Sequence, residues 1–367
     1  MAPAHNTSPP GRTRSSPYME WVKTLPPARF NLAISGMLFC PMSELGVDPS
    51  TLEINGPSAY GHPPLVEAVA RHCSVDPACV VIAEGTSMVN HLAMATLVDP
   101  GDEVLVESPG YELLPATLRY LGAEVRSFPR PRETGFQIDP AALRRALTPR
   151  TRLIVLTNLH NPSSALTPES TLREIGAIAA EAGIRVLVDE VYLETLPGPL
   201  PRSAFHLGPQ FVTTNSLTKA YGLNGLRCGW ALAEPDLARR MWRLNDLFGV
   251  IPSHLSEKVS LAAFHAMPRL RARTEAHLAA HWKLLDTALA GCGVIEWLRP
   301  PSGTVAFPRL TRGSVDAFCS QLLDQHGTRV TPGEFFGAKD HFRLGIAGTT
   351  DMVAPGLKAL RALLDAW

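Results

Sequence analysis

Two nearly continuous apolar runs constrain the fold of this chain most strongly. Residues 152–157 read RLIVLT and residues 184–188 read IRVLV. Such runs suit the central strands of a parallel sheet that is covered on both faces. A helical pattern over 171–182 lies between them, which gives a strand–helix–strand unit. The two runs therefore predict a doubly wound α/β domain.

The same alternation of strands and helices extends over most of the chain. It starts near Pro63, continues to Glu234 and then gives way to long helices. From Val294 onward the pattern is typical of a smaller α+β unit. The expected helices are 65–73, 88–97, 113–121, 171–182, 235–248, 253–266 and 269–290, and the expected strands are 79–83, 103–107, 124–128, 152–157, 184–188, 210–214 and 226–232.

The length of 367 residues suits one large domain and a smaller one. We expect residues 46–252 to form the large domain. The small domain would combine an N-terminal segment, 18–45, with a linking helix and the C-terminal part, 253–367. Residues 1–17 are rich in Pro, Ser and Arg without an acidic side chain, and predict a disordered tail. A transit peptide is the alternative, but this segment lacks an amphipathic apolar face.

The charge balance, the hydropathy and the cysteine content limit which partners and metals the chain is expected to bind. Lys+Arg and Asp+Glu both number 34, so the chain lacks the basic excess that nucleic-acid binding normally needs. No apolar run is long enough to span a bilayer. The six cysteines are scattered without a C-x-x-C pair, which argues against structural zinc and disulfides. We expect a cytoplasmic protein without a metal, a nucleic-acid partner or a membrane partner.

Polar residues follow several of the expected strands. Asp189 and Glu190 come directly after 184–188, and Asn158 comes directly after 152–157. Ligands of open α/β sheets bind outside the carboxyl ends of the strands. One such residue could be a solvated strand end, but agreement between strand ends favours a ligand site.

The sharpest motif is the segment 216–229, SLTKAYGLNGLRCG. Its lysine, Lys219, can form a Schiff base with an aldehyde once its amine is deprotonated. Glycines let the backbone pass close to a ligand, and the fork of Arg227 suits a phosphate. A surface lysine in a glycine-rich loop is the alternative.

This segment resembles the signature of fold type I pyridoxal-5′-phosphate (PLP) enzymes of the class I/II aminotransferase superfamily, S-x-[ST]-K followed by G-x-R-x-G. The remaining landmarks of that superfamily occur in the right order from about Phe30 onward. The resemblance implies a large doubly wound, mostly parallel-sheet PLP-binding domain with a smaller α+β domain formed by the N-terminal segment and the C-terminal third. It also implies an amino-acid substrate, a keto-acid co-substrate and a homodimer.

The resemblance assigns the chemistry to four residues. Lys219 would hold PLP as a Schiff base and move protons at the substrate Cα. Asp189 would pair with the pyridine nitrogen, because a buried carboxylate keeps that nitrogen protonated and the ring a better electron sink. Tyr192, at the D-x-x-Y spacing, would hydrogen-bond the phenolic oxygen together with Asn161. Tyrosine at that position is typical of aminotransferases rather than of acyl-CoA-condensing relatives.

A second group would hold the cofactor phosphate. Gly85, Thr86 and Ser87 stand where a helix is expected to begin, and free N–H groups there favour an anion. Thr and Ser are also ordinary helix caps, so this motif is weak alone. By resemblance, Ser216 and Arg227 complete the phosphate site.

Further residues would contact the cofactor ring and the substrate. By resemblance, Tyr111 stacks on the ring and Gly36 lies over the substrate, which Asn161 also contacts. Arg343, in the sequence HFRLG, would clamp the α-carboxylate, which implies an α-amino acid. An edge-strand arginine in a salt bridge is the alternative.

Several features bear on the loops around the site. Ser108–Pro109 and Asn161–Pro162 match positions where the family often has cis peptide bonds. The common N-P-T-G reads N-P-S-S here. His160 is similar to a histidine of some C–S lyases, with a surface loop residue as the alternative. Tyr60 directly precedes Gly61, unlike the tyrosine that family members contribute across the dimer, so its place in the site stays open.

The reaction stays open between three alternatives. Aminotransfer is preferred; elimination, decarboxylation or cyclisation would use the same residues, because the cofactor does the hard chemistry. A non-catalytic PLP-binding regulator is the third. No arginine lies between Arg243 and Arg269, where enzymes for acidic substrates often place one. We therefore expect a substrate that is not a dicarboxylic amino acid.

Overall fold

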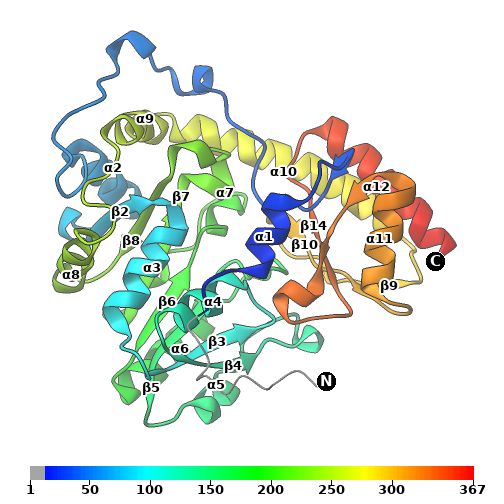
Figure 1. Ribbon diagram of the computed structural model, residues 1–367, viewed down its shortest axis with the longest axis horizontal. Coiled ribbons are helices and arrows are strands. Elements are labelled where there is room, and N and C mark those ends of the chain that lie inside the picture. Colours follow the sequence, from blue (N-terminus) through cyan, green and yellow to red (C-terminus); the bar gives the residue numbers. More distant parts are fainter. Residues whose placement is uncertain (1–12) are drawn as a thin grey trace, which may run out of the picture.

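The structure, a computed structural model, describes residues 13–367 and has a seven-stranded sheet at its centre (Figure 1). Strand β8 is antiparallel to both of its neighbours, and all other pairs in this sheet are parallel. The mostly parallel sheet is therefore confirmed. The strand order is β2 (Val80–Glu84), β8 (Cys228–Leu232), β7 (Phe211–Ser216), β6 (Arg185–Asp189), β5 (Thr151–Thr157), β3 (Glu103–Ser108) and β4 (Glu124–Pro129).

Helices cover both faces of this sheet, which confirms the doubly wound arrangement. Side chains of β5 show why its sequence is so apolar: Leu153 and Val155 enter the core on one face, and Ile154 and Leu156 enter the core on the other. One face is covered by α3 (Gly85–Leu97), α4 (Leu113–Tyr120) and α8 (Pro235–Asn245), the other by α5 (Pro140–Ala146) and α6 (Glu169–Ala182), while α2 (Pro63–Cys73) and α9 (His254–His265) pack at the β2 end.

A second core lies in the C-terminal part, reached through the long helix α10 (Met267–Leu289). Leu32 and Met37 from the N-terminal segment share this core, so the smaller α+β unit joins both ends of the chain as expected. Its other elements are α11 (Val315–His326), α12 (Thr350–Ala366), the pair β1 (Phe30–Asn31) and β12 (Thr328–Arg329), the sheet of β10 (Val305–Ala306), β14 (Phe342–Gly345) and β13 (Thr331–Pro332), and the pair β9 (Ile295–Glu296) and β11 (Arg309–Leu310).

Two short helices that the sequence patterns do not predict matter for the site. Helix α1 (Pro17–Thr24) starts after the N-cap Ser16 and buries Tyr18. Helix α7 (Leu217–Tyr221) carries Lys219. Residues 1–12 of the predicted tail lie outside the described residues. Within 13–367, no helix is both long and apolar enough to cross a bilayer.

Candidate active site

The predicted site residues gather at the carboxyl ends of β5, β6 and β7, where α1 lies between α7 and β14 (Figure 1). Arg343, Asp189 and Arg227 are all close enough to Lys219 for their charges to act on its pKa. Residues that are far apart in the sequence thus lie close to one lysine.

Lys219 is held by the N-terminal segment. Its Nζ donates to Ser35 Oγ at 3.0 Å, and its backbone oxygen accepts from Met37 N at 2.9 Å. A Cβ added to Gly36 would lie 3.6 Å from Lys219 Cδ, so this glycine packs against the lysine stem. Burial lowers the pKa of Lys219. The amine is therefore neutral, and nucleophilic, more often than that of a solvated lysine.

Asp189 ends β6 and is buried. Its carboxylate accepts from Asn90 Nδ2 at 2.9 Å and from Val191 N at 3.1 Å. Burial raises the pKa of Asp189 to about 6 in spite of these bonds. No basic side chain within 13–367 forms a salt bridge with it. A protonated ring nitrogen would supply the missing positive charge.

The start of α3 forms a tight concave site with Arg227. Gly85 has φ +80°, and a Cβ there would lie 2.5 Å from Arg227 Nη2. A Cβ on Gly229 would lie 2.7 Å from Thr86 N. The hydroxyl of Thr86 is buried without a hydrogen-bond partner in the described chain. Unpaired helix N–H groups, this hydroxyl and a guanidinium suit a phosphate.

Arg343, on β14, is completely buried. It donates to Asn161 Oδ1 at 3.0 Å, to Tyr18 Oη at 2.6 Å and to the Ala33 oxygen at 3.3 Å. Its Nε has no partner, and no carboxylate in the part of the chain described lies within 4.0 Å of the guanidinium. The salt-bridge alternative is therefore wrong. Because a buried charge without a counterion is costly, this arginine indicates an anionic ligand.

Two tyrosines complete the site. Tyr192 is buried, and its hydroxyl lies near Ser35 but has no hydrogen-bond partner among residues 13–367. Tyr111 packs edge-on against Tyr18, with ring centroids 6.0 Å apart, and its hydroxyl lies 4.0 Å from Met19 Sδ. Four groups therefore lie around Lys219: the hydroxyl of Tyr192, the ring of Tyr111, the carboxylate of Asp189 and the phosphate site at the start of α3. Together they fit PLP.

His160 is buried rather than on the surface, so the surface-loop alternative is wrong. Its ring bonds Ser163 Oγ at 2.6 Å and the Pro109 oxygen at 2.8 Å. Burial lowers its pKa well below the usual value, which keeps the ring neutral. The side chain therefore joins the loop before Tyr111 to the loop that carries Asn161.

The loop predictions have mixed outcomes. Ser108–Pro109 is cis as expected, but Asn161–Pro162 is not; the cis bond of that loop is Asn158–Leu159. Asn161 N donates to Thr157 Oγ1 at 2.9 Å, which ties this loop to the end of β5. Tyr60 is 44% exposed and bonds Asp246 and Arg243 on the surface of this chain.

Three residues at the site were not predicted: Tyr18, Ser35 and Asn90. Ser35 adjoins the predicted Gly36, and Asn90 lies on the helix that starts at Gly85, so their neighbours signalled both. Asn90 is oriented by Thr214, whose hydroxyl donates to Asn90 Oδ1 at 2.6 Å. Tyr18 has no local signal, because its partner Arg343 is 325 residues away.

Comparison with known proteins decides the family. The model of the family described as aminotransferase class I and II matches residues 52–360. The chain belongs to this family. Membership confirms the resemblance found in the sequence, and the protein is a PLP-dependent transferase.

Three known proteins are similar to this chain over most of their length. Capreomycidine synthase of Streptomyces vinaceus is 33% identical over 83% of this chain and 79% of its own. Arginine–pyruvate transaminase AruH of Pseudomonas aeruginosa is 32% identical over 74% of this chain and 71% of its own. The crystal structure of the PLP-dependent cyclase OrfR superposes with a TM-score of 0.87 at 25% identity, over 98% of this chain and 99% of that one.

Proposed function

We propose that the protein moves the amino group of an α-amino acid to a keto acid. The buried guanidinium of Arg343 supports this proposal most directly, since it has no carboxylate partner among residues 13–367 and lies close to Lys219. When bound, PLP supplies an electron sink for negative charge at the substrate Cα. Arg343 would bind the substrate carboxylate, and Lys219 Nζ would take the proton from Cα and return it at the keto carbon.

The cofactor would be held by residues on several elements. Asp189 would provide the negative charge beside the ring nitrogen, and Tyr192 and Asn161 would donate to the phenolic oxygen. Tyr111 would pack on the ring, and Gly36 would cover the substrate. The phosphate would be bound by Gly85, Thr86, Ser87, Ser216 and Arg227.

The substrate is proposed to be an α-amino acid with an uncharged or basic side chain. The stretch 244–268 has no arginine that could hold a second carboxylate. The similarity to an arginine–pyruvate transaminase makes arginine with pyruvate the first pair to test.

The test uses purified protein loaded with PLP and a panel of amino acids and keto acids. Aminotransfer is expected to yield the keto acid of the donor and the amino acid of the acceptor in equal amounts, detected by mass spectrometry. Lys219→Ala should be inactive, and Arg173→Gln, an exposed residue paired with Glu169, should keep full activity. Release of ammonia or carbon dioxide without a new amino acid would contradict the proposal.

Cyclisation is a second candidate, supported by the likeness to a PLP-dependent cyclase over nearly the whole chain. A cyclase would consume its amino-acid substrate without an amino acceptor and keep the α-nitrogen in the product. Omitting pyruvate from the assay separates the two reactions, because only aminotransfer requires it.

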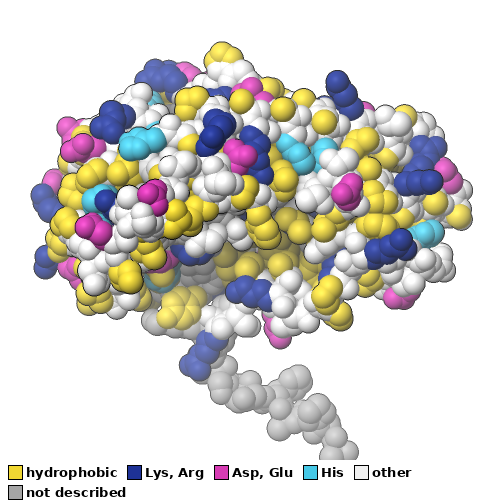
Figure 2. Space-filling view, turned by 90° about the horizontal axis from the view of Figure 1, so that it is seen from above, with side chains coloured by type: hydrophobic (Ala, Val, Ile, Leu, Met, Phe, Trp, Pro, Cys, Tyr) yellow, Lys and Arg dark blue, Asp and Glu magenta, His cyan; other side chains and the backbone are white. Residues whose placement is uncertain are grey.

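We also propose a cytoplasmic homodimer. Large apolar side chains remain exposed beside α8 and α9, among them Leu247 (76%), Val250 (64%) and Ile251 (57%). Figure 2 shows apolar side chains spread over the upper face of the molecule among charged ones. Exposed apolar patches of this kind mark protein interfaces. The six cysteines are all unpaired thiols, which suits a reducing compartment.

A further inference from the structure

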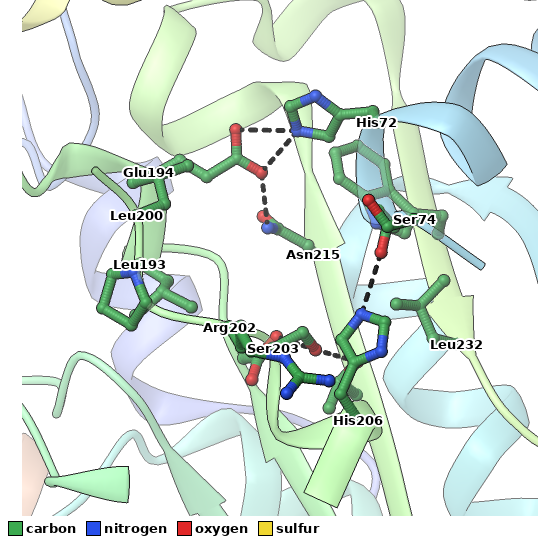
Figure 3. Close-up of a pocket in the computed structure, with 15 residues that line it drawn as sticks. His72, Ser74, Leu193, Glu194, Leu200, Arg202, Ser203, His206, Asn215 and Leu232 are labelled. Carbon is green, nitrogen blue, oxygen red and sulfur yellow. Dashed lines mark hydrogen bonds and ion pairs between the residues drawn. The ribbon is translucent and has the colours of Figure 1, made fainter. Parts of the chain in front are cut away.

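A cavity of about 410 Å³ lies on the face of the sheet that is turned away from α3 (Figure 3). Thr214 of β7 bonds Asn90 of α3, and side chains alternate along a strand, so Thr213 and Asn215 point to the opposite face. Both line the cavity, together with His72 and Glu194. The sheet separates this cavity from the cofactor face on which Asn90 holds Asp189.

Glu194 accepts hydrogen bonds from three side chains beside this cavity. Its carboxylate accepts from His72 Nε2 at 3.1 Å and from Asn215 Nδ2 at 3.0 Å, as Figure 3 shows, and also from the hydroxyl of Tyr221. The Glu194 side chain is only 7% exposed. One buried carboxylate thus joins α2, β7 and α7.

Two of these partners lie at the two ends of the helix that carries Lys219. Asn215 precedes the N-cap Ser216 and accepts from its backbone N–H at 2.7 Å. Tyr221 is the last residue of α7. A helix of five residues has little stability of its own, so contacts at its ends fix its position.

Glu194 belongs to the segment that also carries the other cofactor residues. It lies in the 3-10 helix η5 (Leu193–Thr195), two positions after Tyr192 and five positions after Asp189. Glu194 therefore connects the helix of Lys219 to the segment of Asp189 from behind the sheet.

We infer that Glu194 is a positioning residue that sets where Lys219 lies relative to Asp189, with His72 as its charged partner. The inference rests on the proposed role of Lys219 in binding PLP. Glu194 does not line the cofactor face, so it acts through α7 and not by touching substrate.

The charges around Glu194 keep this pair ionised. The groups that face it are His72 and Cys73 from α2, Tyr221 from α7, Arg271 from α10 and Glu190 from the end of β6. Burial acts to raise the pKa of Glu194, but His72 and Tyr221 outweigh it and lower the pKa.

His72 shows the opposite balance. Burial acts to lower the pKa of His72, but Glu194 outweighs it and raises the pKa. The pair is therefore charged from below the ordinary carboxyl pKa to above the ordinary imidazole pKa. The attraction between the two charges is lost as pH rises through the raised pKa of His72, because the imidazole then becomes neutral. The His72 side chain is 20% exposed.

The test compares Glu194→Gln, which removes the charge at constant size, with Tyr221→Phe, which removes one hydrogen bond. Glu169→Gln, in an exposed pair with Arg173, is the matched control. Aminotransfer kinetics are measured on the PLP-loaded proteins. In PLP-free protein, the acylation of Lys219 by acetic anhydride is followed against pH by mass spectrometry.

Glu194→Gln is expected to lower kcat roughly tenfold or more while KM changes less than about threefold, because a small displacement of a reacting group is costly. The pH midpoint of Lys219 acylation should shift by about half a unit or more, since the surroundings of the amine change. Tyr221→Phe should act in the same direction with smaller effects, and Glu169→Gln should have none.

A folded Glu194→Gln protein that loses only thermal stability, and keeps both kcat and the acylation midpoint, would overturn the inference. Should Glu194→Gln fail to fold, the same measurements on Tyr221→Phe decide. Acylation needs no catalysis. A shifted midpoint in a protein without aminotransfer would therefore contradict the proposed function and leave the positioning role standing.

Discussion

Two buried charged side chains of the candidate site, Asp189 and Arg343, form no salt bridge among residues 13–367. Removing a charge from water costs several kcal/mol unless another charge or several hydrogen bonds offset it. Hydrogen bonds from Asn90 and Val191 offset part of this cost at Asp189. A charged ring nitrogen of the bound cofactor would offset the remaining cost at Asp189. A bound substrate carboxylate would offset the cost at Arg343.

Arg343→Lys is expected to lower kcat/KM for amino acids about 100-fold. Lysine keeps the charge but loses the planar fork, and a charge-assisted hydrogen bond is worth about 1.5–3 kcal/mol. About 2.7 kcal/mol corresponds to this factor of about 100. Steady-state kinetics with the best substrate of the panel give the value.

Arg173→Lys is the control for that change, because Arg173 is exposed and pairs with Glu169 on α6. It should leave kcat/KM unchanged. Unchanged kinetics in Arg343→Lys as well would show that the substrate carboxylate is held elsewhere.

PLP is expected to bind more weakly as pH falls below about 6. Burial raises the pKa of Asp189 to about 6 in the PLP-free protein, so below that pH the carboxyl is protonated and must lose its proton to pair with a charged ring nitrogen. Affinity should fall by up to about tenfold per pH unit in that window. Absorbance titrations of PLP-free protein between about pH 5 and about pH 8 measure it.

Asp189→Asn separates this effect from that of Lys219, whose amine must also be neutral. The variant should bind PLP weakly at all pH values, with a shallower pH dependence that Lys219 alone produces. Equal slopes in both proteins would mean that Asp189 does not pair with the ring.

At the scale of single elements, the start of α3 depends on a glycine. Gly85→Ala would place a Cβ 2.5 Å from Arg227 Nη2 at a backbone φ of +80°. We expect PLP affinity to fall at least about tenfold, since the guanidinium must move away from the phosphate site. Equilibrium binding of PLP checks this value.

Gly183→Ala, at the end of α6, is the matched control. Gly183 has a φ of +66° with no atom within 4 Å of the added Cβ. This variant should lose about 1 kcal/mol of unfolding free energy through backbone strain and bind PLP normally. A similar loss of PLP affinity in both variants would show that only folding is affected.

Sequence patterns predicted the helices and strands that are determined by residues close together in the sequence. The strands β5 and β6 are buried on both faces, and this burial appears in the sequence as apolar runs. The glycines of the lysine motif appear because the backbone passes close to other atoms there, as Gly229 does to Thr86. Helices α1 and α7 are too short for a periodic pattern, and contacts with distant residues hold them. The expected strand at 226–232 starts only at Cys228, because Arg227 has a φ of 50° and ends a 3-10 turn.

At the scale of the whole molecule, two cores meet at the site. We propose the boundaries 46–252 for the large domain and 253–367 with 18–45 for the small one. Shared packing of Leu32 and Met37 with the C-terminal core supports the second assignment. Val259 and Ala263 of α9 pack in the core of the sheet, so the linking helix is anchored on the large side.

The proposed dimer is expected to depend on the connection between α8 and α9. Replacing both Leu247 and Val250 by Asp should convert a dimer of the 39.7 kDa chain into a monomer, because desolvating a carboxylate at an interface is costly. Light scattering after gel filtration measures the mass. Val250 has a φ of 59°, which Asp tolerates better than valine, so the exchange relieves backbone strain.

Leu298→Asp serves as the control, since Leu298 is a 43% exposed residue of the C-terminal part. It should leave the dimer intact. A parent protein that is monomeric at the same concentration would rule out the proposed homodimer.

The contact between Tyr18 and Arg343 means that the protein carries its own competitor for the carboxylate. An arriving amino acid has to displace the phenol that already accepts from this guanidinium at 2.6 Å, so binding is an exchange and not a simple capture. An amine without a carboxylate has no group that could replace the hydrogen bond from Arg343 to Tyr18. If Arg343 binds the substrate carboxylate as proposed, such amines should be rejected before any bond at Cα is broken.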